Sequence, residues 1–419
     1  MKDKTLKKKF TISKYHVDSD ILHITWEDGQ RSQFSSSWLK SCVRNSTRFA
    51  TDSLEYLDCP LNTELEQCYI KAVRVENNHL HIDWDDESEA FSGSWLRVQD
   101  EHLINQSSQS QYGNLWSDAF QMSTITQEQA LASTEWISEL DKNGILRIHG
   151  IDTNNAESAI RSIAAKIGVL HRRIHPTDIN VLKPAPKNVG LDKAYTNEDL
   201  EFHTDAPYYP SPPKIAFLFC QRLEGTEFPI NYFSDGYKIC QELKKSYPEY
   251  YRLLTSTLVN FARRRPRSHH ESAGVEQTDY AFDTQIFTPA ITLDPQGNPT
   301  IIRFHFRSFT GFPSHYSSEH INEYAKAYRL FHHLLKQDKF STNTVIEPGM
   351  MVVFNNHRLV HARSKISNTA NRIGNLAYID EYIWESRLRL LLSQQAQLPS
   401  HWLKGCTTQA LEELANRWQ

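Results

Sequence analysis

The sequence lacks the features of membrane, secreted and nucleic-acid-binding proteins. No apolar run approaches the roughly 18 residues that a membrane-spanning helix needs. No apolar stretch of signal-peptide length follows the basic start, so we expect that the chain is not secreted. The formal net charge of the 419 residues is −4, which is no electrostatic footprint for nucleic acid. These absences predict a cytoplasmic protein without a membrane or nucleic-acid partner.

Cysteine is scarce, and its spacing matches neither a zinc-binding motif nor a disulfide-rich scaffold. The six cysteines are Cys42, Cys59, Cys68, Cys220, Cys240 and Cys406, and no two form a C-x-x-C pair. This spacing argues against a zinc ribbon and against a disulfide-rich domain, and it fits a reducing cytosol. Hydrophobic residues make up 39% and charged residues 23%, which suits a packed core in one large or two ordinary domains.

An internal echo marks the first hundred residues. The segment LHITWED at 22–28 is matched by LHIDWDD at 80–86, and FSSSWL at 34–39 is matched by FSGSWL at 91–96. Each copy predicts an alternating strand, a turn and a short Trp-Leu element. Two copies are fewer than the three that a solenoid usually needs, so the echo indicates a small β-rich domain.

The remaining chain predicts a second, larger domain. We expect the β-rich accessory domain over 1–102, a Gln- and Ser-rich linker over 103–125 and the larger domain over 126–419. Helical patterns lie at 126–140, 155–167 and 320–336, and apolar strands at 214–219, 300–304, 350–354 and 373–378. Many strands with a few helices predict a mainly β fold with flanking helices, specifically a double-sheet jelly roll, or double-stranded β-helix.

Three H-x-D tripeptides occur, and context separates them. They are His16/Asp18, His81/Asp83 and His203/Asp205. Roughly one such match is expected by chance, so the tripeptide alone is weak evidence for a metal site. The third one precedes Pro207 and a long apolar strand, and a His and an Asp two apart on an extended segment point to the same face. We therefore take His203 and Asp205 as candidate metal ligands.

A third ligand would complete a triad of two His and one carboxylate on Fe(II), which leaves positions for a bidentate co-substrate and O2. His361, after the strand at 350–354, is the best candidate, and His357 competes with it four residues earlier. Arg372 opens the last strong strand. Its guanidinium could hold the distal carboxylate of a 2-oxoacid through two parallel hydrogen bonds.

At this point a family resemblance appears. The residues that carry it are Ala194–Thr196 and Phe202–Asp205 with Pro212 and Pro213, Thr255–Phe261, Pro348–Gly349 with Phe354–Arg363, and Arg372, Ala377 and Tyr378 with Ser386–Arg389. Together they resemble the γ-butyrobetaine hydroxylase-like branch of the Fe(II)/2-oxoglutarate dioxygenases, of the TauD/TfdA type. The Trp-Leu units resemble the small accessory domain of that branch.

The resemblance implies an oxidoreductase and assigns its residues. It implies His203, Asp205 and His361, rather than His357, as iron ligands, and Arg372 as the partner of the 2-oxoglutarate carboxylate. Fe(II), 2-oxoglutarate and O2 would then hydroxylate, or otherwise oxidise, an unactivated C–H bond of a small molecule, giving succinate and CO2. We also expect a homodimer. Further co-substrate contacts are expected from Arg363 and Asn231, and substrate contacts from Tyr195, Tyr378, Arg307, His175 and Asp192.

The accessory domain departs from the family pattern. Family members often carry a zinc site of three closely spaced cysteines and a distant His. The matching stretch here, 38–45, keeps only Cys42, and the stretch 85–89 has no His. Zinc needs about four ligands, so we expect no structural zinc.

The substrate pattern also departs from the family. Betaine-binding members hold a trimethylammonium group in an aromatic cage. Tyr195 and Tyr378 match two of the four cage positions, whereas the other two fall near His175 and Ile179. Arg307 stands where an amide is expected. We therefore expect a small polar, amino-acid-like or anionic metabolite as substrate, as in specialised metabolite biosynthesis.

Two alternatives to this substrate prediction stay open. The first is a γ-butyrobetaine or trimethyllysine hydroxylase whose cage is rebuilt, with Tyr208 and Tyr209 as the aromatic candidates. The second is a catalytically silent jelly roll that binds a ligand. A basic cluster at 263–267 is read as a solvated loop or as a patch for an anionic substrate.

Overall fold

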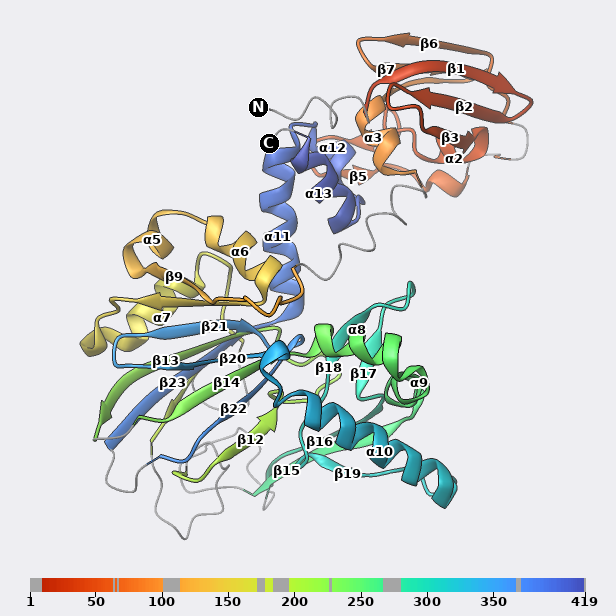
Figure 1. Ribbon diagram of the computed structural model, residues 1–419. Coiled ribbons are helices and arrows are strands. Elements are labelled where there is room, and N and C mark those ends of the chain that lie inside the picture. Colours follow the sequence, from red (N-terminus) through yellow and green to blue (C-terminus); the bar gives the residue numbers. More distant parts are fainter. Residues whose placement is uncertain are drawn as a thin grey trace. The chain divides into compact units, whose positions relative to one another are not determined.

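The computed structural model describes residues 10–62, 65, 68–100, 114–171, 178–183, 196–225, 228–266, 280–366 and 371–417. The chain forms two compact units, of which one is Met1–Gln111 with Leu388–Gln419 and the other is Tyr112–Arg387 (Figure 1). No helix within the described ranges has the length and apolar character to cross a membrane.

The first unit is built from a repeated strand-and-helix pattern. Its elements are β1 (Ile12–Asp18), β2 (Ile21–Trp26), β3 (Arg31–Ser35), α2 (Ser36–Ser41), β4 (Phe49–Ala50), β5 (Glu55–Tyr56), a 3-10 turn (Pro60–Asn62), β6 (Ala72–Glu76), β7 (His79–Asp83), β8 (Ser88–Ser92), α3 (Gly93–Val98), α12 (Ser400–Leu403) and α13 (Thr408–Asn416). The sheets β1-β2-β3 and β6-β7-β8 are both antiparallel.

The internal echo is confirmed as a structural repeat. Leu22 lies opposite Phe34 in the first sheet, and Leu80 lies opposite Phe91 in the second. The serine that ends each third strand caps the following helix, because its hydroxyl accepts a hydrogen bond from the backbone N–H three residues on. Alternation of apolar residues buries one face of each sheet, which is why the sequence pattern predicted these strands.

The two C-terminal helices complete the core of this unit. The indole of Trp402 packs against Trp95 and Phe91, at centroid distances of 4.8 and 5.6 Å. Leu411 and Leu414 are fully buried in the same cluster. The sequence placed everything from 126 to 419 in the larger domain, whereas the structure groups Leu388–Gln419 with the N-terminal residues. An apolar helix face shows that a helix is packed but does not show which core it joins.

Ion pairs hold the stretch around Cys42, where the sequence predicts no structural zinc site. The buried ammonium of Lys40 lies 2.9 Å from Glu87 Oε1 and also pairs with Asp86. The guanidinium of Arg48 lies 2.8 Å from the same Glu87 oxygen. Cys42 is half-buried, and burial raises the pKa of its thiol. Helix α2 and the segment after it are thus tied to the loop before β8 by charge pairs.

The second unit contains two large sheets and an inserted helical layer. Its strands are β9 (Ser123–Thr126), β10 (Ile145–His149), β11 (Ile179–Leu182), β12 (Leu200–His203), β13 (Ile215–Glu224), β14 (Ile230–Asp235), β15 (Val259–Pro266), β16 (Tyr280–Thr288), β17 (Ile291–Leu293), β18 (Pro299–Ile302), β19 (Phe309–Gly311), β20 (Ser341–Val345), β21 (Met351–Asn355), β22 (Leu359–Arg363) and β23 (Asn371–Ile379). Its helices are α5 (Gln127–Ala132), α6 (Glu135–Asn143), α7 (Ala156–Ala164), α8 (Gly236–Ser246), α9 (Pro248–Ser256), α10 (Ser318–Leu334) and the first part of α11 (Glu381–Ala396), with 3-10 turns at Thr153–Asn155 and Asp338–Phe340.

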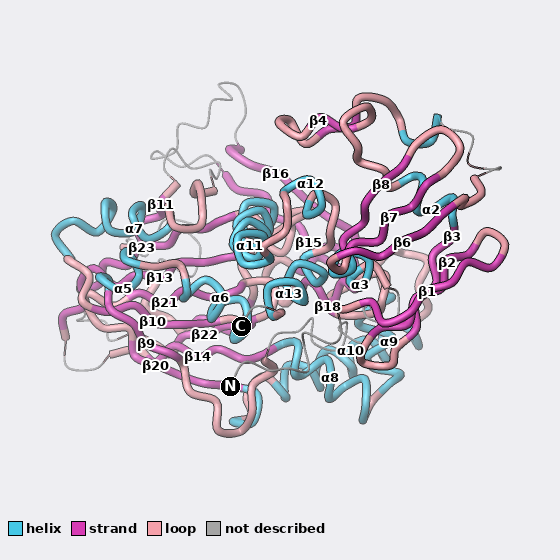
Figure 2. The backbone as a smooth tube through the Cα atoms, turned by 90° about the horizontal axis from the view of Figure 1, so that it is seen from above, coloured by secondary structure: helices cyan, strands magenta, loops and turns pink. Residues whose placement is uncertain are grey.

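The two large sheets pack face to face. One has the strand order β11-β23-β13-β21-β10-β9, and the other has β12-β22-β14-β20. Phe233 of β14 and Phe354 of β21 meet between them, with ring centroids 5.3 Å apart, and both are buried. Helices α6 and α7 pack on the larger sheet, as Figure 2 shows. This mainly β arrangement with flanking helices agrees with the predicted fold class.

The predicted helix over 126–140 is broken in the structure. Thr126 caps α5 with a reciprocal capping box to Gln129, and α5 ends before Ser133, whose backbone is extended. A second helix, α6, then runs to Gly144, which ends it in the left-handed conformation at φ 75°. Helical periodicity continues across the break, so the sequence pattern did not reveal it.

Candidate active site

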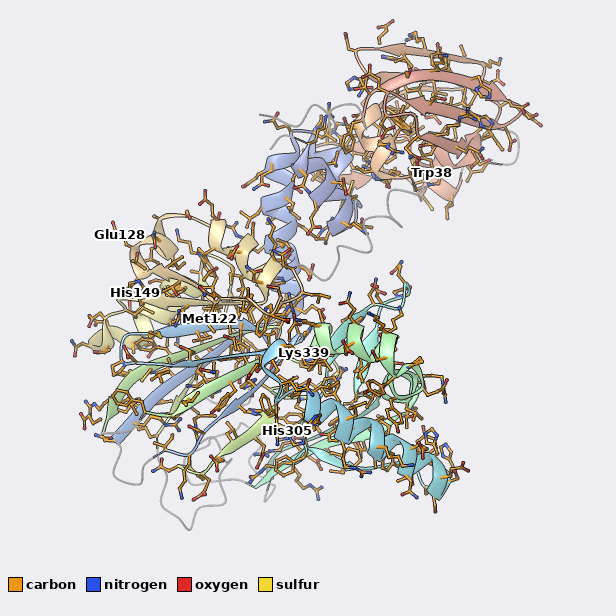
Figure 3. All side chains as sticks on the ribbon, viewed as in Figure 1. Trp38, Met122, Glu128, His149, His305 and Lys339 are labelled. Carbon is orange, nitrogen blue, oxygen red and sulfur yellow. The ribbon has the colours of Figure 1, made fainter. Side chains whose placement is uncertain are left out.

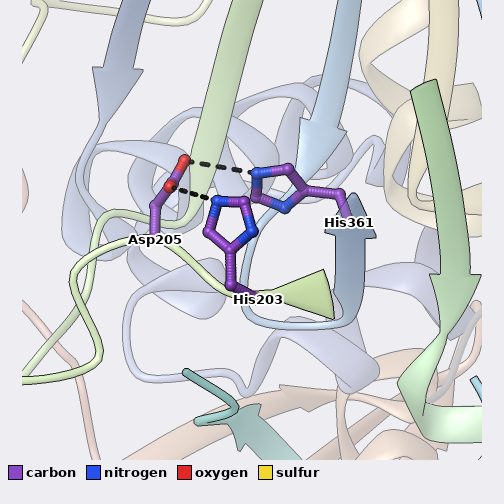
Figure 4. Close-up of side chains that lie close together, drawn as sticks. All are labelled: His203, Asp205 and His361. Atoms are coloured by element: carbon purple, nitrogen blue, oxygen red, sulfur yellow. Dashed lines mark ion pairs between the residues drawn. The ribbon is translucent and has the colours of Figure 1, made fainter. Parts of the chain in front are cut away.

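Three predicted metal ligands meet at the end of the smaller sheet. His203 is the last residue of β12 and lies directly opposite His361 of β22. Asp205 follows two residues after His203. One ligand atom from each of the three side chains lies within 4.8 Å of the others (Figure 4). His203 Nε2 is 3.5 Å from Asp205 Oδ1, and His361 Nε2 is 3.8 Å from Asp205 Oδ2.

The backbone around Asp205 is held by an amide that the sequence analysis did not single out. The Asp205 N–H donates to Asn356 Oδ1 at 2.7 Å, and Asn356 Nδ2 donates back to the Asp205 carbonyl at 3.0 Å. Ala206 has φ 51°, so the chain turns sharply just after the ligand. The N–H of Thr204 donates to the carbonyl of Phe304. Protein contacts therefore preset the turn that carries the carboxylate.

The hydrogen bonding of His203 and the pKa of His361 both suit metal binding. His203 Nδ1 lies 2.7 Å from the carbonyl of Glu201, so this nitrogen carries the proton and Nε2 is left as the ligand atom. Burial lowers the pKa of His361 to about 3, with repulsion from His203 contributing. The imidazole is neutral above that pH, which is the form that binds a metal. Two imidazoles and a carboxylate fit the donor set that Fe(II) uses in a facial triad.

His357 is placed differently from its competitor. Its ring is fully buried, and its Nε2 lies 2.7 Å from the carbonyl of Pro212, to which it donates. Burial lowers the pKa of His357 to about 3. The ring thus anchors the Pro212 segment and is not part of the three-residue group.

Two arginines line the same cavity as the three candidate ligands. Arg372 of β23 and Arg363 of β22 are both buried there, and Asn231 of β14 lines the cavity beside them. Burial and repulsion from Arg372 lower the pKa of Arg363 to about 9, and burial also lowers the pKa of Arg372. Among the described residues that line the cavity, Asp205 is the only acidic one. This excess of buried positive charge favours an anionic ligand, such as a carboxylate.

The two arginines differ in what else they contact. Arg363 Nη2 donates to the carbonyls of Thr196 and Glu198, at 3.0 and 2.7 Å. Arg363 is therefore partly committed to holding the segment that leads into β12. Arg372 lies beside Cys220, whose thiol pKa is raised to about 11 by burial. The cavity wall around Arg372 is otherwise largely apolar, which strengthens any charge pair formed there.

The predicted substrate contacts are only partly brought together. Tyr378 is buried, and its hydroxyl donates to Asp205 Oδ2 at 2.7 Å. Arg307 is exposed, with its guanidinium 5.6 Å from the ring of Phe306, and it does not line the cavity. Tyr195, His175 and Asp192 lie outside the described residues.

His305 is a neighbour of the site that the sequence analysis missed. Its ring stands perpendicular to the ring of His203, with centroids 5.5 Å apart, and Figure 3 labels it. The N–H of Ser308 donates to His305 Nδ1 at 3.1 Å, so the neutral ring carries its proton on Nε2. The run RFHFR at 303–307 contains this histidine, but the sequence there does not form an H-x-D or another metal-ligand motif.

Comparisons with known families show to which family the chain belongs. Residues 111–378 match the family model described as "Taurine catabolism dioxygenase TauD, TfdA family". Residues 13–97 match the model described as "Gamma-butyrobetaine hydroxylase-like, N-terminal". The first match spans more than half of the chain, so the protein belongs to the TauD/TfdA family of dioxygenases. It is an Fe(II)- and 2-oxoglutarate-dependent dioxygenase that acts on a small molecule.

Individual relatives resemble both parts of the chain. The gamma-butyrobetaine dioxygenase of Homo sapiens is 26% identical over 398 residues, which cover 88% of this chain and 94% of that one. The trimethyllysine dioxygenase of Meyerozyma guilliermondii is 22% identical over 410 residues, covering 91% and 96%. A solved structure of asparagine oxygenase with Fe(II), 2S,3S-3-hydroxyasparagine and succinate matches 60% of this chain and 78% of that chain, with 13% identity and a TM-score of 0.45.

Proposed function

We propose that this enzyme hydroxylates a small zwitterion that carries a quaternary ammonium group, of the γ-butyrobetaine or trimethyllysine kind. The observation that carries the proposal is the extent of the resemblance. The match to the gamma-butyrobetaine dioxygenase of Homo sapiens covers 94% of that chain, accessory part included. These relatives support the betaine-type alternative better than the anionic metabolite that the sequence departures suggested.

The geometry supports a division of roles within the site. His203, Asp205 and His361 would bind Fe(II), because their ligand atoms converge, the hydrogen bond of His203 Nδ1 leaves Nε2 for the metal, and the low pKa of His361 keeps that ring neutral. Arg372, with Arg363 and Asn231 nearby, would bind the 2-oxoglutarate dianion in the cavity. The bound iron and co-substrate supply the oxidising chemistry. The protein residues would hold the metal and neutralise the co-substrate charge, and the apolar cavity wall would exclude water from the site.

The finer structural statements belong to the same proposal. The two packed sheets would form a double-stranded β-helix, or jelly roll, with the site at the end of the smaller sheet. We also propose a homodimer in the cytoplasm. Light scattering after size-exclusion chromatography tests whether the protein is a homodimer, and a mass of one chain would contradict that proposal.

An amino-acid-like or anionic metabolite, as in specialised metabolism, remains a second candidate. The specific observation in its favour is Ile179, near a cage position that is aromatic in betaine-binding enzymes. Ile179 is buried in β11 opposite Ala377. A trimethylammonium group would lose an aromatic face there, worth about 0.5–2 kcal/mol. The predicted role of Arg307, which is to bind an anionic group of the substrate, stays a prediction.

The deciding experiment is a substrate screen that measures succinate formation with Fe(II), 2-oxoglutarate and ascorbate. The panel holds γ-butyrobetaine, trimethyllysine, free amino acids and their carboxylated or phosphorylated derivatives. We expect substrate-dependent succinate with a quaternary ammonium compound, and mass spectrometry should find one added oxygen in the product. Turnover restricted to anionic derivatives would replace the betaine proposal by the second candidate.

A further inference from the structure

Tyr378 contacts a predicted metal ligand through its hydroxyl and is itself rigidly placed. It lies near the end of β23, opposite Ala216 of β13, and is 1% exposed. Its carbonyl accepts a hydrogen bond of 2.7 Å from the N–H of His171. With the strand pairing on one side and this contact on the other, the ring has little freedom to move away from Asp205.

The hydroxyl donates to one particular oxygen of the Asp205 carboxylate. The distance from Tyr378 Oη to Asp205 Oδ2 is 2.7 Å, within the range of a charge-assisted hydrogen bond. The other oxygen, Oδ1, is the one nearest to His203 Nε2, at 3.5 Å. A hydrogen bond to one oxygen fixes the rotation of the carboxylate, so that both oxygens keep their places relative to the two imidazoles.

We propose that Tyr378 is a positioning residue for the metal: its hydroxyl orients the Asp205 carboxylate and thereby sets the affinity of the site for a divalent cation. This inference rests on the proposed metal-binding role of His203, Asp205 and His361. Partners that orient metal ligands typically contribute about 10- to 100-fold to metal affinity. The contact joins residues 173 positions apart, so it exists only once β23 has docked beside the turn after β12.

This role differs from the one that the sequence resemblance assigns to Tyr378. A cage residue would use the face of its ring to attract a trimethylammonium group, and its oxygen would be dispensable. Tyr378→Phe keeps the ring and removes only the oxygen. If Tyr378 acts solely as a cage wall, this variant binds metal normally. If Tyr378 positions Asp205, the variant binds metal more weakly even without substrate.

The test measures Mn²⁺ binding to the full-length protein by electron paramagnetic resonance, with no substrate or co-substrate present. Mn²⁺ is a divalent probe that accepts the same nitrogen and oxygen ligands and does not oxidise readily in air. We expect Tyr378→Phe to raise the dissociation constant about 10- to 100-fold. The matched control is Tyr237→Phe, because Tyr237 also donates a hydroxyl hydrogen bond from a partly buried ring, to the carbonyl of Thr300 at 2.6 Å.

The two variants separate positioning from general stability. Each should lower the thermal midpoint of the metal-free protein by a similar amount, whereas Tyr237→Phe should leave Mn²⁺ affinity unchanged. A dissociation constant of Tyr378→Phe within twofold of the wild type overturns the positioning role. Asp205→Ala reports separately on the metal site, and unchanged Mn²⁺ binding in that variant would overturn the proposed metal role and the positioning role with it.

Discussion

Trp402, near the C-terminus, packs against Trp95 of the N-terminal unit, with ring centroids 4.8 Å apart and the ring planes tilted by 47°. The guanidinium of Arg44 lies 5.7 Å from the Trp402 ring and 5.9 Å from the Trp95 ring, so a cation completes the cluster. The N-terminal unit is therefore built from both ends of the chain. Its stability depends on residues that a purely sequential division would assign to the catalytic domain.

Trp402→Ala should destabilise the N-terminal unit by about 3–5 kcal/mol, the usual cost of removing a large buried aromatic ring. The measurement is hydrogen exchange of the β2 and β7 amides, which should lose protection. Leu390→Ala is the control, since Leu390 is 55% exposed and belongs to the same unit, and its effect should stay within about 0.5 kcal/mol. Unchanged protection in Trp402→Ala would contradict the shared core.

His361→Ala should remove bound iron and abolish turnover while the protein still folds, because a triad that lacks one ligand loses its metal geometry. His357→Ala should keep the iron and instead lower the thermal midpoint, because His357 is buried and anchors Pro212. Iron analysis after anaerobic reconstitution and succinate formation are the two readouts. The reverse pattern, with activity lost only in His357→Ala, would show that the ligand is misassigned.

Arg372→Ala should raise the 2-oxoglutarate concentration needed for half-maximal rate by about 10- to 100-fold. A charge-assisted bidentate pair contributes roughly 1.5–3 kcal/mol, and each 1.4 kcal/mol is tenfold. Arg222→Ala is the control, because Arg222 lies on the neighbouring strand with a side chain that is 53% exposed. An unchanged requirement in Arg372→Ala would point to Arg363 as the partner of that carboxylate.

Zinc analysis of the purified protein should give far less than one zinc per chain, even after growth with added zinc. Cys42 alone cannot supply the four ligands that a structural zinc needs, and Lys40, two residues before it, pairs with Glu87. Cys42→Ser should therefore leave the zinc content and the thermal midpoint nearly unchanged. Near-stoichiometric zinc that survives loss of His203 and His361 would refute this prediction.

Much of the site could be predicted because the motifs that mark it are local in the sequence. His203 and Asp205 are two residues apart, and β22 carries His361 shortly after a strongly apolar strand. The contacts of Tyr378 and His305 could not be predicted from the sequence. Tyr378 reaches Asp205 from 173 residues away, and His305 meets His203 through a turn between β18 and β19. Such pairs depend on which strands become neighbours, which no local pattern encodes.

By itself the sequence left His361 and His357 as alternatives, and the family resemblance selected His361. What the sequence determined directly are the repeated strands of the N-terminal unit and the candidate roles of His203, Asp205 and Arg372. These follow from alternation, from spacing and from the chemistry of single side chains. Only the tertiary structure decided that Leu388–Gln419 completes the N-terminal core and that the Tyr378 hydroxyl points at Asp205. An apolar face or a phenol can be satisfied by many partners, and the partner is selected only when packing brings one particular surface within a few ångströms.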